Sequence, residues 1–390
     1  MKILCLTSRL PWPPDRGDRL RAFHVLETLA KDHELTLLSF VESSEQRALL
    51  AHLKPFCREI RIVEKSRAAS ILTVVANGWR RLPLQTLYYR SGAMRRLVGA
   101  TLAEGFFDAA YVHLFRMAPY LGRSDVPYRI VDLTDMISSE LDRSLRHRSG
   151  MSRLVYSFER RRIERCEEML AGEGDEIWLI SPAERSALVD RCPGANAHVV
   201  SNGVDCDVFQ PLEGEEEPST IVFTGHMGVF HNVDAAAFLA NSVLPLVRRE
   251  FPDLRLRIVG ASPCRRVRGL HRPPAVTVTG FVPDLNLELN RGGVFVAPLR
   301  FSAGVQNKVL EAMAAARPVV TTSTVARGLD AEADRHLLVA ESAEDFAGRI
   351  TGLLADADRR KALGAAARRF VNDRFSWRFV ADRAREIAER

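Results

Sequence analysis

The chain has 390 residues, of which 46% are hydrophobic and 27% are charged. At about 150 residues per domain this length suggests two domains, and the composition excludes disordered and fibrous classes. The formal net charge of +6 suits nucleic acid, an anionic membrane surface or phosphate-bearing substrates. Nucleic acid ranks last because no nucleic-acid-binding motif appears.

The six cysteines are spread along the chain without a C-x-x-C pair or a cluster with histidines. We therefore expect reduced thiols in a cytosolic protein rather than a zinc site or a disulfide framework. The apolar run at the N-terminus is too short for a signal peptide and predicts a first strand. No run of about 18 apolar residues predicts a transmembrane helix.

The first half of the chain alternates strands with helices. A strand at 1–8, a helix around 20–30 and a strand at 35–40 form a βαβ unit, which implies a parallel sheet. Further strands are expected at 60–63, 109–113, 128–132, 176–180 and 198–200. The strongly charged stretch 153–171 predicts a long helix.

Residues 58–96 mix basic side chains with apolar and aromatic ones. Such a mixture is typical of segments that lie on an anionic membrane surface. It is equally compatible with a solvated helical face over an ordinary core. Both interpretations remain open at this point.

The acidic stretch 211–220, PLEGEEEPST, has no apolar periodicity and is interpreted as an inter-domain linker. After it, strands are expected at 221–224, 254–259, 276–279, 294–298 and 318–321, with helices at 235–249 and 307–316. We expect an N-terminal domain at 1–210 and a C-terminal domain at 211–371. A C-terminal helix at about 372–390 is expected to pack back on the first domain.

The segment 297–320 carries the strongest functional signal. A strand is followed by a loop with Gly304 and by a helix that opens near Asn307, which together predict an anion site. Lys308 in the first turn can neutralise a diphosphate, and Glu311, on the same face, can accept hydrogen bonds from ribose hydroxyls. The alternative is an ordinary surface Lys–Glu pair.

This segment resembles the donor-binding motif of the retaining glycosyltransferases of family 4, which includes a helix reading L-E-A-M-A-x-G-x-P-V-V. The matching residues are Leu310, Glu311, Ala312, Met313, Ala314, Pro318, Val319 and Val320. Other similar elements are N-G-V-D at 202–205, the strand end at Gly225, T-G-F-V at 279–282 and the strand that ends at His113. The chain is most similar to the sugar transferases of exosortase/PEP-CTERM exopolysaccharide loci, through P-P-D-x-G-D at 13–18, Y-V-H-L-F-R-M at 111–117 and G-x-Q-N-K-V-L-E-A-M at 304–313.

The resemblance implies an α/β protein with the GT-B fold, in which two doubly wound Rossmann-like domains face a central cleft. It implies transfer of a hexose from a nucleoside-diphosphate-sugar with retention of configuration, and with neither metal nor cofactor. The implied donor-binding residues are Gly17, Gly225, His226, Val282, Gly304, Val305, Gln306, Asn307, Lys308 and Glu311. Catalytic roles are expected for His113, Lys308 and Glu311.

Several of these residues have structural alternatives. Asp15, Asp18 and Arg21 flank Gly17 and are expected on the acceptor side, although both aspartates are equally compatible with turn and cap roles. His113 is expected near the sugar, and a histidine satisfied at a strand end is the alternative.

The sequence departs from the family pattern at two places. The first glutamate of the family motif is replaced by Ala303, and His226 and Asn232 stand near the positions of the family's diphosphate-binding Arg and Lys. We infer that Lys308 takes over part of the phosphate neutralisation.

The expected acceptor is lipid-linked or a polysaccharide, in exopolysaccharide or cell-surface glycan synthesis. We expect a cytoplasmic protein with peripheral contact to the inner membrane face. One alternative is a GT-B sugar-nucleotide 2-epimerase, and another is a non-catalytic GT-B partner subunit, which the alanine at position 303 favours. A Rossmann dehydrogenase fits poorly because no G-x-G-x-x-G follows the first strand.

Overall fold

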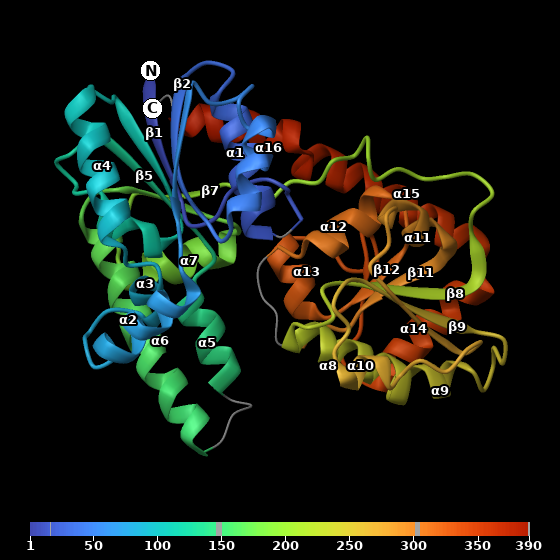
Figure 1. Ribbon diagram of the computed structural model, residues 1–390. Coiled ribbons are helices and arrows are strands. Elements are labelled where there is room, and N and C mark those ends of the chain that lie inside the picture. The colour runs from blue at the N-terminus through green and yellow to red at the C-terminus, as the bar shows by residue number, and fades with distance from the viewer. Residues whose placement is uncertain (16, 146–149, 301–304, 389–390) are drawn as a thin grey trace. The chain divides into compact units, whose positions relative to one another are not determined.

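The computed structural model describes residues 1–15, 17–145, 150–300 and 305–388. These residues form two compact units, one of residues 1–201 with those from 381 onward, and one of residues 202–380. Each unit contains a parallel sheet with helices packed on it (Figure 1). The expected α/β class with two Rossmann-like domains is confirmed.

The sheet of the first unit has the strand order β3-β2-β1-β4-β5-β6-β7. Its strands are β1 (Lys2–Thr7), β2 (Glu34–Val41), β3 (Glu59–Glu64), β4 (Ala109–His113), β5 (Tyr128–Thr134), β6 (Glu176–Leu179) and β7 (Ala197–Val199). β1 and β4 bury every residue except Lys2, because both faces of a parallel sheet are covered. The order reverses between β1 and β4, and sheets of this type bind ligands at the carboxyl ends of the strands beside such a reversal.

The helices of the first unit begin with serine caps where the chain enters α2, α4 and α7. Ser66, Ser91 and Ser181 each accept a hydrogen bond from the backbone N–H three residues later. The helical segments are α1 (Gly17–Leu29), η1 (Ser44–His52), α2 (Arg67–Asn77), α3 (Leu84–Tyr88), α4 (Gly92–Glu104), η2 (Phe115–Tyr120), α5 (Ile137–Leu145), α6 (Gly150–Gly172) and α7 (Pro182–Arg191).

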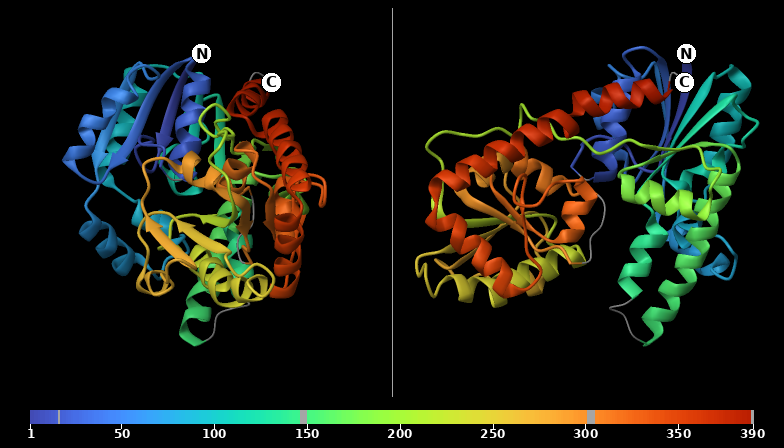
Figure 2. Two further views of the ribbon diagram at one scale, coloured as in Figure 1. Left: turned by 90° about the vertical axis from the view of Figure 1, so that its right-hand side faces the viewer. Right: turned by 180° about the vertical axis from the view of Figure 1, so that it is seen from behind.

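The C-terminal helix α16 (Trp377–Ala388) returns to the first unit. Arg385 pairs with Asp32 at 2.8 Å, just after the end of α1. Figures 1 and 2 both show the last turns of α16 beside α1. The predicted C-terminal helix is therefore present and reaches the first unit from residue 381.

The sheet of the second unit repeats the same pattern, with the order β10-β9-β8-β11-β12-β13 and a reversal between β8 and β11. Its strands are β8 (Glu217–Thr224), β9 (Arg255–Val259), β10 (Val276–Gly280), β11 (Gly292–Ala297), β12 (Val319–Thr321) and β13 (Leu338–Val339). Its helical segments are α8 (Phe230–Phe238), η3 (Leu239–Val243), α9 (Leu244–Val247), α10 (Arg265–Arg268), α11 (Leu285–Arg291), α12 (Asn307–Ala314), α13 (Ser323–Leu329), α14 (Ala343–Ala355) and α15 (Ala357–Phe375). In Figure 1, α12 and α15 cover one face of this sheet, and α8, α9 and α14 cover the other.

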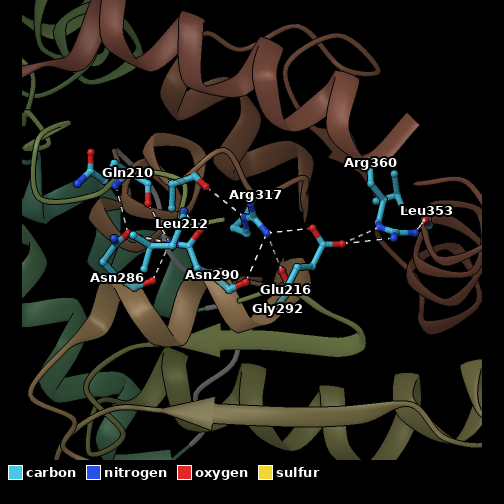
Figure 3. Close-up of polar contacts among 10 residues, drawn as sticks. Gln210, Leu212, Glu216, Asn286, Asn290, Gly292, Arg317, Leu353 and Arg360 are labelled. Atoms are coloured by element: carbon cyan, nitrogen blue, oxygen red, sulfur yellow. Dashed lines mark hydrogen bonds and ion pairs between the residues drawn. The ribbon is translucent and has the colours of Figure 1, made fainter. Parts of the chain in front are cut away.

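The segment expected to be a linker is bound to the second unit (Figure 3). The Leu212 N–H donates to Asn290 Oδ1 at 2.9 Å. Glu216 forms ion pairs with Arg317 and Arg360, each at 3.3 Å. Residues 217–220 already belong to β8, so acidic side chains without apolar periodicity mark an anchored strand entry here rather than a free linker.

The first unit ends at residue 201 rather than at 210, because 202–210 is held by α15. The Val204 N–H donates to the Phe375 carbonyl at 2.7 Å, and Arg368 donates to the Phe209 carbonyl at 2.9 Å. For the same reason the second unit continues to residue 380, beyond the expected end at 371.

Candidate active site

The carboxyl edge of the second sheet brings three glycines together where β8, β9 and β10 end. Gly225, Gly260 and Gly280 all have positive φ angles, of 155°, 145° and 76°. The Gly225 N–H donates to the Val259 carbonyl, and the Gly260 N–H donates to the Gly280 carbonyl, each at 3.0 Å. A Cβ on Gly260 would lie 1.8 Å from the Gly225 carbonyl oxygen. Only glycine permits this close packing of strand ends.

Lys308 lies in the first turn of α12, directly after the loop that follows β11. Its ammonium donates to Asn232 Oδ1 at 2.6 Å and lies 5.8 Å from the centre of the Phe223 ring. Glu311 follows one turn later on the same face of α12. A cation, a carboxylate and the N-terminus of a helix are therefore gathered beside the β8–β11 reversal.

Burial shifts the protonation equilibria of this group. Desolvation lowers the pKa of Lys308 to about 8, partly offset by the charge of Glu311. Desolvation likewise raises the pKa of Glu311 to about 7, against the opposing effect of Lys308. The pKa of His231 falls to about 4 through burial and the nearby Lys308. The negative charge of a bound anion would compensate for the desolvation of Lys308 and favour its charged form.

Asn232 orients the loop that follows β8. Its side chain accepts from Lys308 and donates to the His226 carbonyl at 3.0 Å. The His226 ring nitrogen Nδ1 in turn accepts from the Gly228 N–H at 3.3 Å. Asn232 stands near a position where the resemblance implies a cation, and its side-chain amide instead accepts a hydrogen bond from Lys308.

Four further predicted donor residues of the second unit, at positions 282 and 305–307, follow β10 and β11. Asn307 accepts a hydrogen bond from the Asn202 side chain at 3.0 Å, Gln306 is the residue that precedes α12, and Val305 is buried. Val282 is partly exposed in the loop after β10. Gly304 and Ala303 lie outside the described residues.

In the first unit, Arg21 forms a buried ion pair with Asp132. The Arg21 Nε lies 2.7 Å from Asp132 Oδ2, and its Nη1 donates to the Val200 carbonyl at 2.6 Å. Tyr111 donates its hydroxyl to the same carboxylate at 2.6 Å. Both side chains of the ion pair are fully buried. Arg21 therefore has a structural role here, in place of the acceptor contact that was expected of it.

His113 ends β4 and is 3% exposed. Its ring stacks on Tyr111 with 6.3 Å between the centres, and its Nε2 has no hydrogen-bond partner among the described residues. Burial lowers the pKa of His113 to about 4, so the ring is neutral at physiological pH. A neutral ring with an unused nitrogen at a strand end can accept or donate one hydrogen bond to a ligand.

Of the other predicted residues of the first unit, Asp18 in α1 lies close enough to His113 for an electrostatic interaction. Gly17 begins α1 and is exposed, and Asp15 pairs with Arg19 at 3.1 Å. Asp18 pairs with Arg9 at 2.9 Å. Burial opposes ionisation of Asp18, but the combined effect of Arg9, His113 and Arg116 outweighs it, so the pKa of Asp18 lies below its usual value. The ion pair with Arg9 gives Asp18 a structural role in addition to the turn or cap role considered from the sequence.

Three cations at the carboxyl edge of the first sheet were not predicted as functional residues from the sequence. Arg9, Lys65 and Arg116 follow β1, β3 and β4 within three residues of the strand ends. Their positions shortly after predicted strands could have indicated that these side chains lie together, because parallel strands end at one edge of the sheet.

A cavity of about 590 Å3 lies elsewhere, at the amino ends of β1 and β2, and is lined by Lys2, Glu34 and Asp108 among others. The groups described above are all at the opposite, carboxyl edge. This cavity therefore does not enter the site.

Residues 218–356 match the family model "Glycosyl transferases group 1". The chain is 20% identical over 386 residues to an uncharacterized 44.6 kDa protein in the cps region of Klebsiella pneumoniae, and 96% of each chain is covered. It is 28% identical over 247 residues to the alpha-maltose-1-phosphate synthase of Mycolicibacterium smegmatis, with 55% of this chain and 62% of that enzyme covered.

Among solved structures, the Anabaena HepE complex with UDP and glucose is similar with a TM-score of 0.68 and 15% identity, over 100% of this chain and 99% of that chain. Sucrose-phosphate synthase from Thermosynechococcus elongatus gives a TM-score of 0.74 at 15% identity, over 100% and 98%. Residues 218–356 are thus similar to the group 1 glycosyltransferases, and the two units of the chain have the fold of the GT-B glycosyltransferases.

Proposed function

We propose that this protein transfers a sugar from a nucleoside-diphosphate-sugar to an acceptor with retention of anomeric configuration. The observation that carries the proposal is the Lys308–Asn232 contact at 2.6 Å beside the N-terminus of α12. It lies within the domain that matches the group 1 glycosyltransferases. The similarity to HepE, whose structure contains UDP and glucose, supports a nucleotide-sugar as donor.

In this proposal the second unit stabilises the leaving diphosphate. Negative charge develops on the diphosphate oxygen as the glycosidic bond breaks, and donors fixed before the reaction stabilise it most. The Lys308 ammonium and the positive end of the α12 dipole supply this stabilisation. Glu311, one turn further, accepts hydrogen bonds from the ribose hydroxyls. No metal is needed in this scheme, because the protein neutralises the leaving group.

His113 is proposed to contact the transferred sugar. Its neutral ring offers one nitrogen that has no partner among the described residues. A sugar hydroxyl is a suitable partner, because it satisfies a buried polar atom at the cost of little reorganisation.

The acceptor is proposed to be lipid-linked, with the protein at the cytoplasmic membrane face in exopolysaccharide or cell-surface glycan synthesis. The first unit exposes apolar side chains on α2, directly after α2 and on α6: Ile71, Leu72, Val75, Trp79, Met151, Leu154 and Phe158. Arg162 on α6 donates to the Gly78 carbonyl, directly after α2, at 2.6 Å, so α6 contacts the end of α2. The exposed Arg80 and Arg81 follow α2 and complement anionic headgroups. None of the described helices is long and apolar enough to span a membrane.

The decisive experiment measures binding and turnover on one panel. Nucleoside-diphosphate-sugars that differ in base and sugar are screened by thermal shift, in which a true donor raises the melting temperature. Each hit is then incubated with membrane lipid extract from the source cells, with and without EDTA, and the lipid fraction is analysed for added sugar. Isomerisation of the donor without transfer, or no turnover with any hit, would contradict the proposal.

A further inference from the structure

Three cations of the first unit share one aromatic side chain at the carboxyl edge of its sheet. The Lys65 ammonium lies 4.7 Å and the Arg116 guanidinium 4.9 Å from the centre of the Tyr89 ring. The Arg9 side chain lies close enough to Tyr89 for an electrostatic interaction between the two. The three basic residues follow β1, β3 and β4, so the parallel sheet itself collects them.

Lys65 is 6% exposed, and its ammonium has no hydrogen-bond partner among the described residues. The rings of Tyr88, at 3.5 Å, and Tyr89 attract the charge but accept no conventional hydrogen bond from it. A buried ammonium in this condition is costly unless something pairs with it. Burial accordingly lowers the pKa of Lys65.

The neighbouring carboxylates are too few to neutralise the cluster. Asp18 pairs with Arg9 at 2.9 Å and lies 3.8 Å from Arg116. Glu42 pairs with the exposed Arg67 at 2.5 Å. Among the described residues of this edge, four cations thus face two carboxylates. In addition, the Nε of Arg9 is buried without a partner among the described residues, so a second donor at this edge is unused.

We propose that Arg9, Lys65 and Arg116 bind a phosphate or diphosphate group at the carboxyl edge of the first sheet. A dianion offers several acceptor oxygens, which match the unused N–H groups and the excess positive charge. A hydroxyl-rich sugar alone would leave the Lys65 charge uncompensated. Tyr89 holds the three cations at a fixed spacing and limits the loss of side-chain entropy on binding.

The proposal rests on the proposed function in one respect: the bound anion is taken to belong to the acceptor. Two sources share this chemistry, namely the diphosphate of a lipid carrier and a phosphate on a soluble glycan. The lipid source is consistent with the exposed apolar side chains of α2, which begins two residues after Lys65.

The experiment titrates the full-length protein with inorganic pyrophosphate by calorimetry in a Lys308→Met background, where the proposed donor site is weakened. The added Lys65→Met replacement is expected to weaken pyrophosphate binding about 10-fold or more, since a charged hydrogen bond is lost. Arg9→Gln is a second variant with the same expectation. Lys54→Met, which removes an exposed lysine of the same unit, should change nothing.

Unchanged pyrophosphate affinity in both Lys65→Met and Arg9→Gln would overturn the inference. An unaltered melting temperature, or a higher one, shows that Lys65→Met is folded, because the variant loses a buried charge without a partner. Farnesyl diphosphate binding more tightly than pyrophosphate assigns the site to a lipid carrier, and equal affinity assigns it to a soluble phosphate. If Lys308→Met alone leaves pyrophosphate and nucleotide binding unchanged, the proposed donor site at Lys308 is contradicted. The effect of Lys65→Met then tests the anion site of the first unit independently.

Discussion

The Lys308 ammonium donates to Asn232 Oδ1 at 2.6 Å, although 76 residues separate the two in the sequence. The contact joins the first turn of α12 to the first turn of α8, and these helices follow β11 and β8. β8 and β11 are the neighbours between which the strand order reverses. The contact therefore marks the point where a ligand of such a sheet binds.

Lys308→Ala is expected to weaken binding of the nucleoside diphosphate by about 10- to 100-fold, because one charged hydrogen bond to the diphosphate is lost. Calorimetric titration measures the affinity. Lys361→Ala, at an exposed position on α15, is the matched control and should bind as the wild type does. Equal affinities in the two variants would refute the role of Lys308.

The same site should show a pH dependence with a defined sign. The free protein has a Lys308 pKa of about 8, so the ammonium is progressively lost above that pH. Affinity for the diphosphate is expected to fall as pH rises through about 8 to 9, where the phosphates are already fully ionised. Lys308→Arg keeps its charge throughout and should flatten the profile. An identical decline in this variant would exclude Lys308 as the titrating group.

Gly260→Ala is expected to destabilise the second unit. Its Cβ would lie 1.8 Å from the Gly225 carbonyl oxygen, and its φ is 145°. Backbone strain and overpacking together cost about 2 to 5 kcal/mol. Urea denaturation measures the loss of unfolding free energy. Gly348→Ala in α14, with nothing within 4 Å of the new Cβ, should instead stabilise by about 0.5 to 1 kcal/mol.

Arg21→Met should lower the unfolding free energy by about 3 to 5 kcal/mol, because it leaves the fully buried Asp132 carboxylate without its cation. Arg58→Met breaks an exposed pair with Glu34 and should cost at most about 1 kcal/mol. Adding Asp132→Leu to Arg21→Met is expected to recover part of the loss. Denaturation curves that rank Arg58→Met as the more harmful change would contradict the structural role of Arg21.

Leu72→Glu combined with Val75→Glu should reduce binding to anionic vesicles. These side chains, 68% and 71% exposed, would enter the headgroup region, and glutamates there oppose both the apolar and the electrostatic attraction. Co-sedimentation with phosphatidylglycerol vesicles measures the loss, with phosphatidylcholine vesicles as the reference. Val208→Glu, an exposed apolar position of the second unit, is the control. Failure of the wild type to bind either vesicle would remove the membrane proposal.

Much of the fold could be predicted because it is encoded locally. The apolar runs that became β1 and β11 are continuous, as both faces of a parallel sheet are buried. The prediction of a free linker before β8 is wrong because the residues that anchor Glu216, Arg317 and Arg360, are distant in the sequence.

The two α/β units, and Lys308 and Glu311 on one face of a helix, follow from helical spacing and strand alternation, which are local properties of the chain. The contact of Asn232 with Lys308, the burial of Arg21 against Asp132, and the grouping of Arg9, Lys65 and Arg116 around Tyr89 depend on tertiary packing. These contacts are not local because a parallel sheet brings strand ends from distant parts of the chain together at one edge. Burial there, which no local pattern encodes, sets which charges are paired and where each group titrates.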